Sequence, residues 1–222
     1  MIVAIDGPAG AGKSTVARLV AEKLGYIYIN TGAMYRAVTW KALQEGINLN
    51  DEEALVSLAK RSCISFADGG SRVILDGLDI TPQTRTPEVD RNISTVVKFP
   101  HLREIMVEQQ RQLGLKNSIV SEGRDLTTVV FPNAEVKIYL DASIDERARR
   151  RQIELIEKGY NLSLEQVRTD TARRDELDKT REHSPLKIAD DAIVIDTTNL
   201  SIEQVVETIL NIVKQAQEKL IE

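Results

Sequence analysis

The chain has 222 residues, of which 42% are hydrophobic and 28% charged, and its formal net charge is −5. This composition is that of a globular protein, and it argues against a broad nucleic-acid-binding face and against a membrane span, which needs roughly 20 apolar residues. Asp6 interrupts the opening apolar run and Cys63 is the only cysteine, so we expect no secretory signal, no internal disulfide and a cytoplasmic location.

The first 25 residues predict a strand, a glycine loop and a helix. A β-branched run over 1–6 breaks at a Gly-Pro pair, and helical spacing follows over 13–25. The loop between them fits the P-loop pattern G-x-x-x-x-G-K-[ST], whose backbone N–H groups and helix N-terminus cradle phosphates. We therefore expect a bound nucleoside triphosphate, with Lys13 on its β and γ phosphates and Ser14 on Mg²⁺. The expected ATP-binding residues are Gly7, Pro8, Ala9, Gly10, Ala11, Gly12, Lys13, Ser14 and Thr15.

The rest of the chain predicts an α/β protein with a small β insert. Asp-Gly-Gly and Asp-Gly turn signals between short apolar runs predict antiparallel hairpins over 64–80. The remaining strands are expected at 26–30, 118–122, 136–141 and 192–196. Helices are expected at 32–46, 52–62 (capped by Asp51), 86–97, 101–113, from Ser143 to about Lys158, from Ser163 to about Thr180, and after Ser201. Each of the last three begins with a capping-box pattern: Ser143 with Glu146, Ser163 with Gln166 and Ser201 with Gln204. Strands separated by helices imply a mainly parallel sheet with helices on both faces.

Two groups of charged residues follow predicted strands. Thr31-Gly32 begins a helix that carries Arg36 one turn later, and Arg124-Asp125 follow the strand 118–122. Each group also has an ordinary explanation. Thr31 could simply cap the helix while Arg36 is solvated, and Arg124 and Asp125 could form a surface turn in which their charges neutralise each other. If both strands are parallel neighbours of the P-loop strand, however, these residues emerge together at the carboxyl edge of the sheet, where α/β proteins bind ligands.

Two predicted helices carry arginines on one face. Arg147, Arg150 and Arg151 are spaced i, i+3, i+4, so without a ligand they repel one another. A second set, Arg174, Asp178 and Arg181, follows at i, i+4, i+7, and a salt-bridged solvent face is its alternative explanation. Clustered arginine in an acidic protein indicates a pocket for a small anion.

These motifs together resemble those of bacterial cytidylate kinases. The segments "GPAGAGKST", "NTGAMYR", "EGRDLTTVVFPNAEVKIYLDAS" and "RRDELDKTR", closed by "SPL", occur in the family's order and at about its separations, and the insert near 63–84 marks the bacterial type. The resemblance implies a nucleoside monophosphate kinase fold of P-loop type, with a five-stranded parallel core and a mobile lid. It implies transfer of phosphate from ATP to CMP or dCMP in pyrimidine metabolism.

The resemblance also implies one domain over 1–222. This domain comprises a core (1–62 and 115–222), a monophosphate-binding and insert region (about 63–114) and a lid (about 147–181). The expected partners are ATP with Mg²⁺ and CMP or dCMP, with no nucleic acid and no membrane, and the chain is expected to be a monomer.

Residue by residue, the resemblance assigns the acceptor site and the catalytic groups. It places Arg36, Arg124 and Arg181 on the CMP phosphate, Thr31 and Tyr35 beside it, Ser94, Arg103 and Asp125 on cytosine, and Arg174 and Asp178 on the ribose. It places Arg147 and Arg151 on the ATP phosphates. The implied catalytic set is Lys13, Arg36, Arg124, Arg147, Arg151 and Arg181. Where the family often has Asp-Ser-Gly, this chain has Asn30-Thr31-Gly32, so the role of Asn30 is left open.

Two other kinds of function remain as alternatives. One is a kinase of the same fold for UMP, AMP or a non-nucleotide acid, and the other is a nucleotide-dependent switch that hydrolyses ATP slowly. Asp141 is interpreted as a residue leading into a helix rather than as a Walker B aspartate, and His101 and His183 as surface residues.

Overall fold

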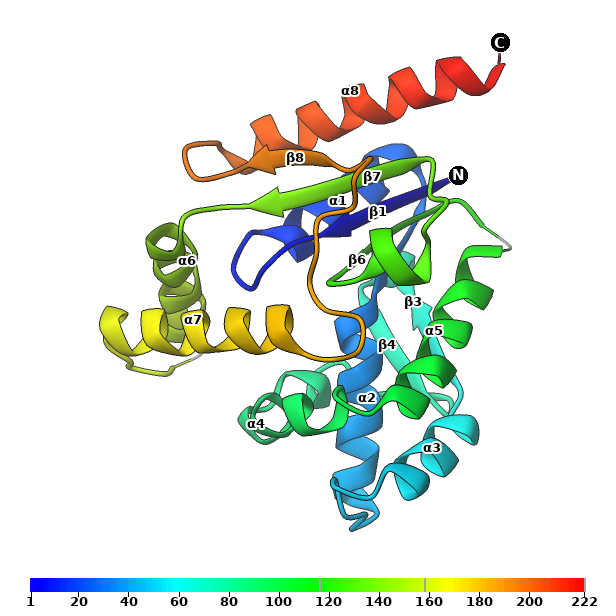
Figure 1. Cartoon of the computed structure of the whole chain (residues 1–222), viewed down its shortest axis with the longest axis vertical. Coiled ribbons are helices and arrows are strands. Elements are labelled where there is room, and N and C mark those ends of the chain that lie inside the picture. Colours follow the sequence, from blue (N-terminus) through cyan, green and yellow to red (C-terminus); the bar gives the residue numbers. More distant parts are fainter. Residues whose placement is uncertain (116, 158, 222) are drawn as a thin grey trace.

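The computed structural model describes residues 1–115, 117–157 and 159–221, and its centre is a five-stranded parallel sheet (Figure 1). The strands are β1 (Ile2–Asp6), β2 (Ile27–Asn30), β6 (Ile119–Gly123), β7 (Val136–Asp141) and β8 (Ile193–Asp196), in the order β2-β6-β1-β7-β8. The predicted parallel α/β sheet is thereby confirmed.

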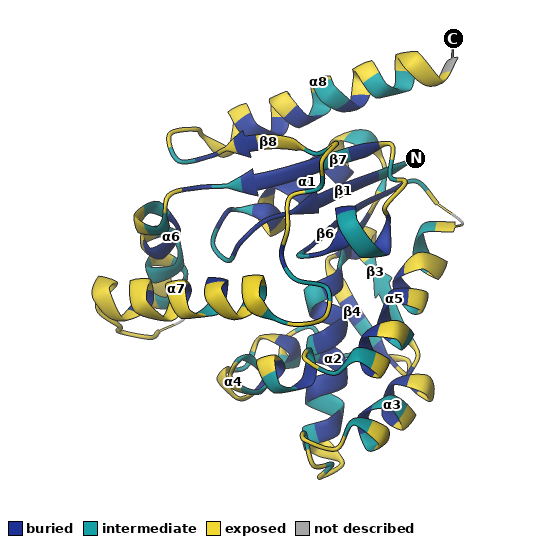
Figure 2. Ribbon diagram, in the orientation of Figure 1, coloured by how far each residue is buried: buried dark blue, intermediate teal, exposed yellow. Residues whose placement is uncertain are grey.

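Helices cover both faces of the sheet because side chains alternate along each strand. Val3 and Ile5 of β1 face α1 (Lys13–Leu24) and α8 (Ile202–Ile221), whereas Ala4 faces the opposite layer. The opposite layer contains α2 (Thr31–Gln44), α3 (Glu52–Lys60), α4 (Pro87–Val96) and α5 (Pro100–Leu115). The central strands are mostly buried, while α8 exposes its outer side (Figure 2).

Two helices, α6 (Ile144–Glu157) and α7 (Leu164–Thr180), lie against each other beyond the end of β7 (Figure 1). The predicted end of the first of them, Lys158, lies outside the described residues. Ser163 and Gln166 form the predicted reciprocal capping box at the start of α7. Within the described ranges, no helix is long and apolar enough to cross a membrane.

The insert is a separate antiparallel sheet, as predicted. Its strands are β3 (Ile64–Ala67), β4 (Arg72–Leu75) and β5 (Leu78–Asp79). Asp76 and Gly77 both have positive φ, 51° and 83°, as a two-residue hairpin turn requires. The sheet packs through Val73, Leu75 and Ile80 on the helix α2.

The sheet order corrects one expectation. β6 lies between β1 and β2, so the strand that ends at Asn30 is not a neighbour of the P-loop strand. The carboxyl ends still coincide, because Asp6 is in register with Gly123, and Asn30 with Glu122. The P-loop and the two charged segments therefore start from one edge of the sheet.

A short π-helical turn, Leu126–Val130, follows β6, and the sequence did not predict it. The buried carboxylate of Asp6 accepts hydrogen bonds from the backbone N–H groups of Leu126 (3.0 Å) and Thr127 (2.7 Å) and from the Thr127 hydroxyl (2.7 Å). Burial raises the pKa of Asp6 to about 6, and these hydrogen bonds oppose the rise. The turn leaves Asp125 buried, so the alternative of a self-neutralising surface turn is wrong.

Candidate active site

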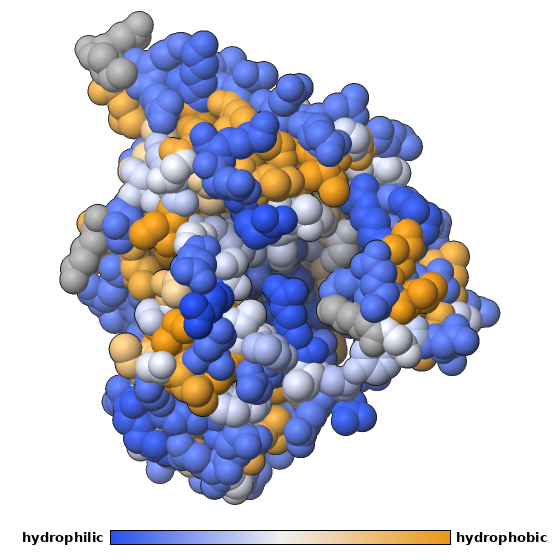
Figure 3. All heavy atoms as spheres, turned by 180° about the vertical axis from the view of Figure 1, so that it is seen from behind, coloured by the Kyte–Doolittle hydropathy of each residue, from blue (hydrophilic) through white to orange (hydrophobic). Residues whose placement is uncertain are grey.

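A cavity of about 1190 Å³ opens at the carboxyl edge of the sheet. Its walls come from the P-loop, from the start of α2, from residues 122–125 at the end of β6 and just after it, and from α4, α6 and α7. Seen from behind, the molecule is hollowed near its centre, and hydrophilic side chains predominate around the hollow (Figure 3). This position is the one at which open α/β sheets bind ligands.

The P-loop forms one wall of the cavity, and its glycines are needed for its shape. A Cβ on Gly7 would lie 2.0 Å from the carbonyl oxygen of Leu140, and one on Gly10 would lie 2.9 Å from that of Arg147. Residues 9–15 line the cavity, whereas Gly7 and Pro8 lie behind the lining. Gly7 therefore lets the loop turn close to β7, and the loop's N–H groups are left for an anion.

Lys13 is buried at the base of this loop. Its ammonium donates to the carbonyl oxygen of Pro8 at 2.7 Å. Burial, and next the positive charge of Arg124, lower the pKa of Lys13 to about 7. A bound polyphosphate would supply the negative charge that this position lacks.

All ten residues predicted for the acceptor site line the same cavity. They are Thr31, Tyr35, Arg36, Ser94, Arg103, Arg124, Asp125, Arg174, Asp178 and Arg181. They come from α2, α4, α5, the turn after β6, and the end of α7, so only the folded chain brings them together. Their location is as predicted, and their roles stay predictions.

The arginines of this wall are held by two aspartates, Asp125, which is buried, and Asp178, which is half-buried. Arg103 forms an ion pair with Asp125, and Arg181 lies 3.8 Å from the other oxygen of that carboxylate. Arg124 donates to Asp178 at 2.8 Å. The Nε of Arg103 is buried and makes no hydrogen bond to any described residue, so it is free to donate to a ligand. These pairs place cations around the cavity at fixed positions.

Two further arginines differ in how they are compensated. Arg36 lies 3.4 Å from the carboxylate of Asp90 on α4. Arg174 forms no hydrogen bond or ion pair with any residue of the described ranges. Burial, and then the positive charges of Arg124 and Arg36, lower the pKa of Arg174 to about 10. Because these cations oppose one another, the wall favours an anion.

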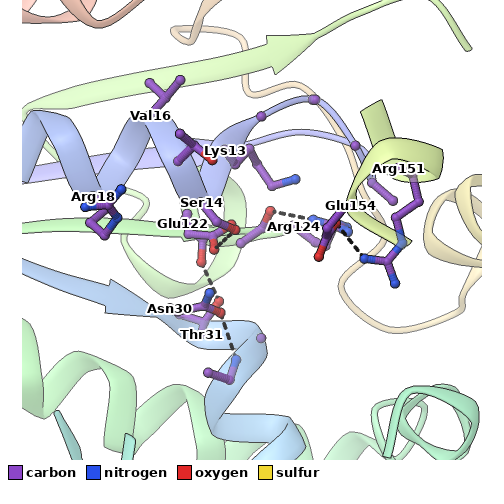
Figure 4. Close-up of a pocket in the computed structure, with 18 of the residues that line it drawn as sticks. Lys13, Ser14, Val16, Arg18, Asn30, Thr31, Glu122, Arg124, Arg151 and Glu154 are labelled. Atoms are coloured by element: carbon purple, nitrogen blue, oxygen red, sulfur yellow. Dashed lines mark hydrogen bonds and ion pairs between the residues drawn. The ribbon is translucent and has the colours of Figure 1, made fainter. Parts of the chain in front are cut away.

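The helix α6 presents to the cavity only one of the two arginines expected there. Arg147 is buried, donates to the carbonyl oxygens of Ala142 (2.9 Å) and Ala9 (3.0 Å), pairs with Asp175 at 2.5 Å, and does not line the cavity. Arg151 does line it and pairs with Glu154 at 2.7 Å (Figure 4). Helical spacing alone does not distinguish the face that packs on α7 from the face at the cavity.

The residue-by-residue assignment gave no individual role to Arg150 or to Glu122, although Arg150 belongs to the arginine face predicted on this helix. Arg150 lines the cavity and donates to the hydroxyl (3.0 Å) and carbonyl oxygen (2.7 Å) of Thr197. Glu122 is buried at the end of β6 and accepts a hydrogen bond from Ser14 at 2.6 Å. The sequence feature that could have indicated Glu122 is an acidic residue at the end of a predicted apolar strand.

The remaining candidate residues lie as interpreted. Asp141 accepts from the backbone of Ala142 at 2.8 Å and does not line the cavity. His101 and His183 are exposed. The described residues contain no group of three or more His, Cys, Asp or Glu side chains that could hold a metal ion by themselves.

Comparison with known proteins places the chain in a family. Residues 3–215 match the family model described as Cytidylate kinase. The chain is 51% identical to the cytidylate kinase of Bacillus licheniformis, with 99% of this chain and 98% of that protein covered. It is 52% identical to the cytidylate kinase of Bacillus subtilis, with 96% of both covered.

Among solved structures, the fold is similar to that of a gluconokinase from Sinorhizobium meliloti, with a TM-score of 0.50 and 15% identity over 99% of this chain and 94% of that chain. A protein from Eubacterium ventriosum, described as uncharacterized, gives a TM-score of 0.52 and 13% identity over 96% of this chain and 98% of that chain. At these identities the likeness concerns the fold alone. The sequence matches decide the family, and the chain belongs to the cytidylate kinases.

Proposed function

We propose that the protein transfers the γ-phosphoryl group of ATP to CMP or dCMP, giving ADP and CDP or dCDP. The observation that carries this proposal is that the P-loop and a second, arginine-rich wall face one cavity. A nucleotide switch needs one anion site, whereas a kinase whose acceptor is itself a phosphate needs two. The membership of the cytidylate kinase family supports the same reaction.

For the donor, residues 9–15 would hold the phosphates of ATP, with Lys13 on the β and γ groups. The residues present also fit Mg²⁺, because the Ser14 hydroxyl and the Glu122 carboxylate are oxygen groups that meet at the cavity wall. When bound, Mg²⁺ would offset negative charge on the phosphates. Phosphate and water would supply most of its ligands, as is usual for this ion.

For the acceptor, Arg36, Arg124 and Arg181 would bind the phosphate of CMP, with Thr31 and Tyr35 beside them. Each guanidinium is a fork of N–H donors that suits phosphate oxygens. Asp178 already fixes the Nε of Arg124, which leaves other N–H groups of that guanidinium for the ligand. Arg174, which has no partner among the described residues, and Asp178 would hold the ribose.

For the base, Asp125 would accept from the amino group of cytosine, while Arg103 and Ser94 would donate to its ring nitrogen and carbonyl oxygen. UMP has a carbonyl and an N–H at those positions, so a carboxylate would face a lone pair. A buried polar group left unpaired costs about 1–3 kcal/mol, which would disfavour UMP.

The reaction needs no general base, because a phosphate oxygen of CMP is already ionised at neutral pH. Lys13, Arg36, Arg124 and Arg181 would neutralise charge on the transferring group and align donor with acceptor. Arg151 would reach the ATP phosphates from α6. Arg147 would join it only after a movement of the lid, about residues 147–181, because its side chain is now held by Ala9 and Asp175.

We propose the same organisation for the chain as a whole. It would act as one domain, with the core and the insert region forming opposite sides of the cavity. All the proposed side chains come from one chain, so a monomer would suffice for activity.

An ADP-release assay tests the function. ATP and Mg²⁺ are supplied with CMP, dCMP, UMP, AMP, GMP or shikimate in parallel. We expect turnover with CMP and dCMP and little with the others. Turnover with another acceptor would keep the kinase chemistry but reject the cytosine assignments, and ATP turnover indifferent to every acceptor would favour the nucleotide switch.

A further inference from the structure

Asp90 is a carboxylate that lies among the arginines of the cavity. It belongs to the first turn of α4 and lines the cavity. Its oxygen Oδ1 lies 3.4 Å from Nε of Arg36 on α2, and Oδ2 lies 3.8 Å from Nη2 of Arg151 on α6. Figure 4 shows Arg151 extending from α6 beside Glu154. One carboxylate thus joins an arginine of the predicted acceptor site to an arginine of the predicted lid.

The two ion pairs of Asp90 are looser than those that hold other arginines of the cavity. Arg124 donates to Asp178 at 2.8 Å, and the pair of Arg103 with Asp125 is buried. By contrast, 3.4 Å and 3.8 Å exceed the usual hydrogen-bond range of about 2.7–3.2 Å, and the side chain of Asp90 is 31% exposed. Partly exposed pairs contribute little stability. The partners of Asp90 can therefore be exchanged at small cost, whereas the tighter pairs fix their arginines in place.

A phosphate is a stronger partner for Arg36 and Arg151 than Asp90 is. Arg36 is proposed to bind the phosphate of CMP, and Arg151 the phosphates of ATP. A phosphate monoester carries a charge of about −1.5 to −2 near pH 7, and guanidinium groups bind phosphate through two parallel hydrogen bonds. A phosphate on either arginine would also repel the nearby carboxylate. Asp90 and the nucleotide phosphates therefore compete for the same two cations.

Stabilisation of the helix does not explain why this carboxylate faces arginines. An acidic residue in the first turn stabilises a helix through its dipole, and Glu88 also supplies this charge in α4. Glu88 is exposed and forms no ion pair with any residue of the described ranges. Asp90 differs from it by facing cations. Besides its two pairs, it opposes the lowering of the pKa of Arg174 that burial causes.

We infer that Asp90 is a competing anion built into the cavity: it pairs with Arg36 and Arg151 and has to be displaced from them before nucleotide phosphates bind there. It lowers the affinity of these arginines for every anion. A nucleotide offsets this loss through contacts with its base and ribose, whereas inorganic phosphate has no such contacts and is kept out. The inference rests on the proposed function for the identity of the nucleotides.

The test measures ligand binding to Asp90→Asn, which keeps the size of the side chain and removes its charge. Calorimetry gives the affinity for CMP and for ATP, and competition with CMP gives the affinities for inorganic phosphate and cytidine. We expect CMP and inorganic phosphate to bind about 2–5-fold more tightly than to the unmodified protein, the range that partly exposed ion pairs imply. ATP should gain less, because the pair with Arg151 is the longer one. Cytidine, which has no phosphate, should bind as before.

Two further variants make the result specific. Glu88→Gln is the matched control, because it removes the same charge from the same turn of α4 without removing an ion pair, and it should leave all four affinities unchanged. In an Arg36→Met background, Asp90→Asn should change CMP affinity by less than it does in the unmodified protein, because the carboxylate then has no Arg36 to occupy. Circular dichroism shows that each variant is folded.

The outcomes separate the inference from the proposed function. Unchanged CMP affinity in Asp90→Asn, or an equal gain in Glu88→Gln, would overturn the competition. Weaker CMP binding in Asp90→Asn would also overturn it and would show that Asp90 positions Arg36 instead. In each of these cases the unmodified protein would still bind CMP and transfer phosphate to it. Absence of CMP binding to the unmodified protein would reject the proposed function, and the inference with it.

Discussion

Replacement of Asp125 by alanine tests how much the folded state depends on the buried charges of the acceptor wall. The side chains of Arg103 and Asp125 are 5% and 10% exposed, and Arg181 lies 3.8 Å from the same carboxylate. Asp125→Ala would leave Arg103 with a 3.3 Å hydrogen bond to the carbonyl oxygen of Val97 and no anion. Removing one partner of a buried pair costs about 3–5 kcal/mol.

The measurement is thermal unfolding without nucleotides, followed by circular dichroism. For a chain of this length, the expected loss corresponds to a fall in Tm of about 6–20 °C. Arg103→Met in the Asp125→Ala background should restore part of the stability, because it removes the isolated cation and keeps much of the side-chain volume. A single variant with the original unfolding midpoint, or a double variant whose losses simply add, would refute the reasoning.

Three further predictions concern the site and its support. Arg124→Ala should lower the rate of phosphoryl transfer by about 10²–10³-fold, since Arg124 lines the cavity; a variant of equal activity would remove it from the site. Lys13 has a pKa of about 7 in the free protein, and the phosphates of ATP should keep it fully protonated in the complex. ATP binding should therefore take up roughly 0.9 of a proton at pH 8 and roughly 0.1 at pH 6. For the same reason, ATP affinity should fall as pH rises above 7. Calorimetry in buffers of different ionisation enthalpy measures this uptake, which Lys13→Met should abolish. Asp6 has a folded pKa of about 6, above its unfolded value, so its titration favours the folded state below pH 4, and this contribution is lost as pH rises through 6. The stability difference between the unmodified protein and Asp6→Asn should therefore change by about 2 kcal/mol between pH 4 and pH 7, and a constant difference would contradict the shift.

Local signals in the sequence predicted most of the elements, because caps and turns depend on near neighbours. Ser163 and Gln166 form both bonds of a capping box. At Ser143 only half of the box forms: the hydroxyl accepts from the backbone of Glu146 at 3.3 Å, while the Glu146 carboxylate pairs with Arg149 and Arg150. The backbone N–H of Ser143 donates instead to the Thr198 hydroxyl at 2.9 Å. A local pattern of capping residues does not include such a partner, which is 55 residues away.

Features that depend on distant residues were harder to predict. The turn Leu126–Val130 is held by Asp6, which is 120 residues away from Leu126, and no local pattern indicates it. Arg147 was assigned to ATP phosphates, yet in this structure it donates to Ala9 and pairs with Asp175. The acceptor wall was predicted better, because several motifs at fixed separations specified it together.

The position of β6 between β1 and β2 has a consequence for synthesis of the protein. The strands β1 and β2 do not pair with each other. Both pair with β6, which starts at Ile119. At about 5–20 residues per second, a ribosome needs many seconds to make that partner. During this interval the nascent chain holds two apolar strands with open edges. Chains that stop before Ile119 should therefore aggregate or be degraded, and folding should become cooperative only once β6 has left the ribosome.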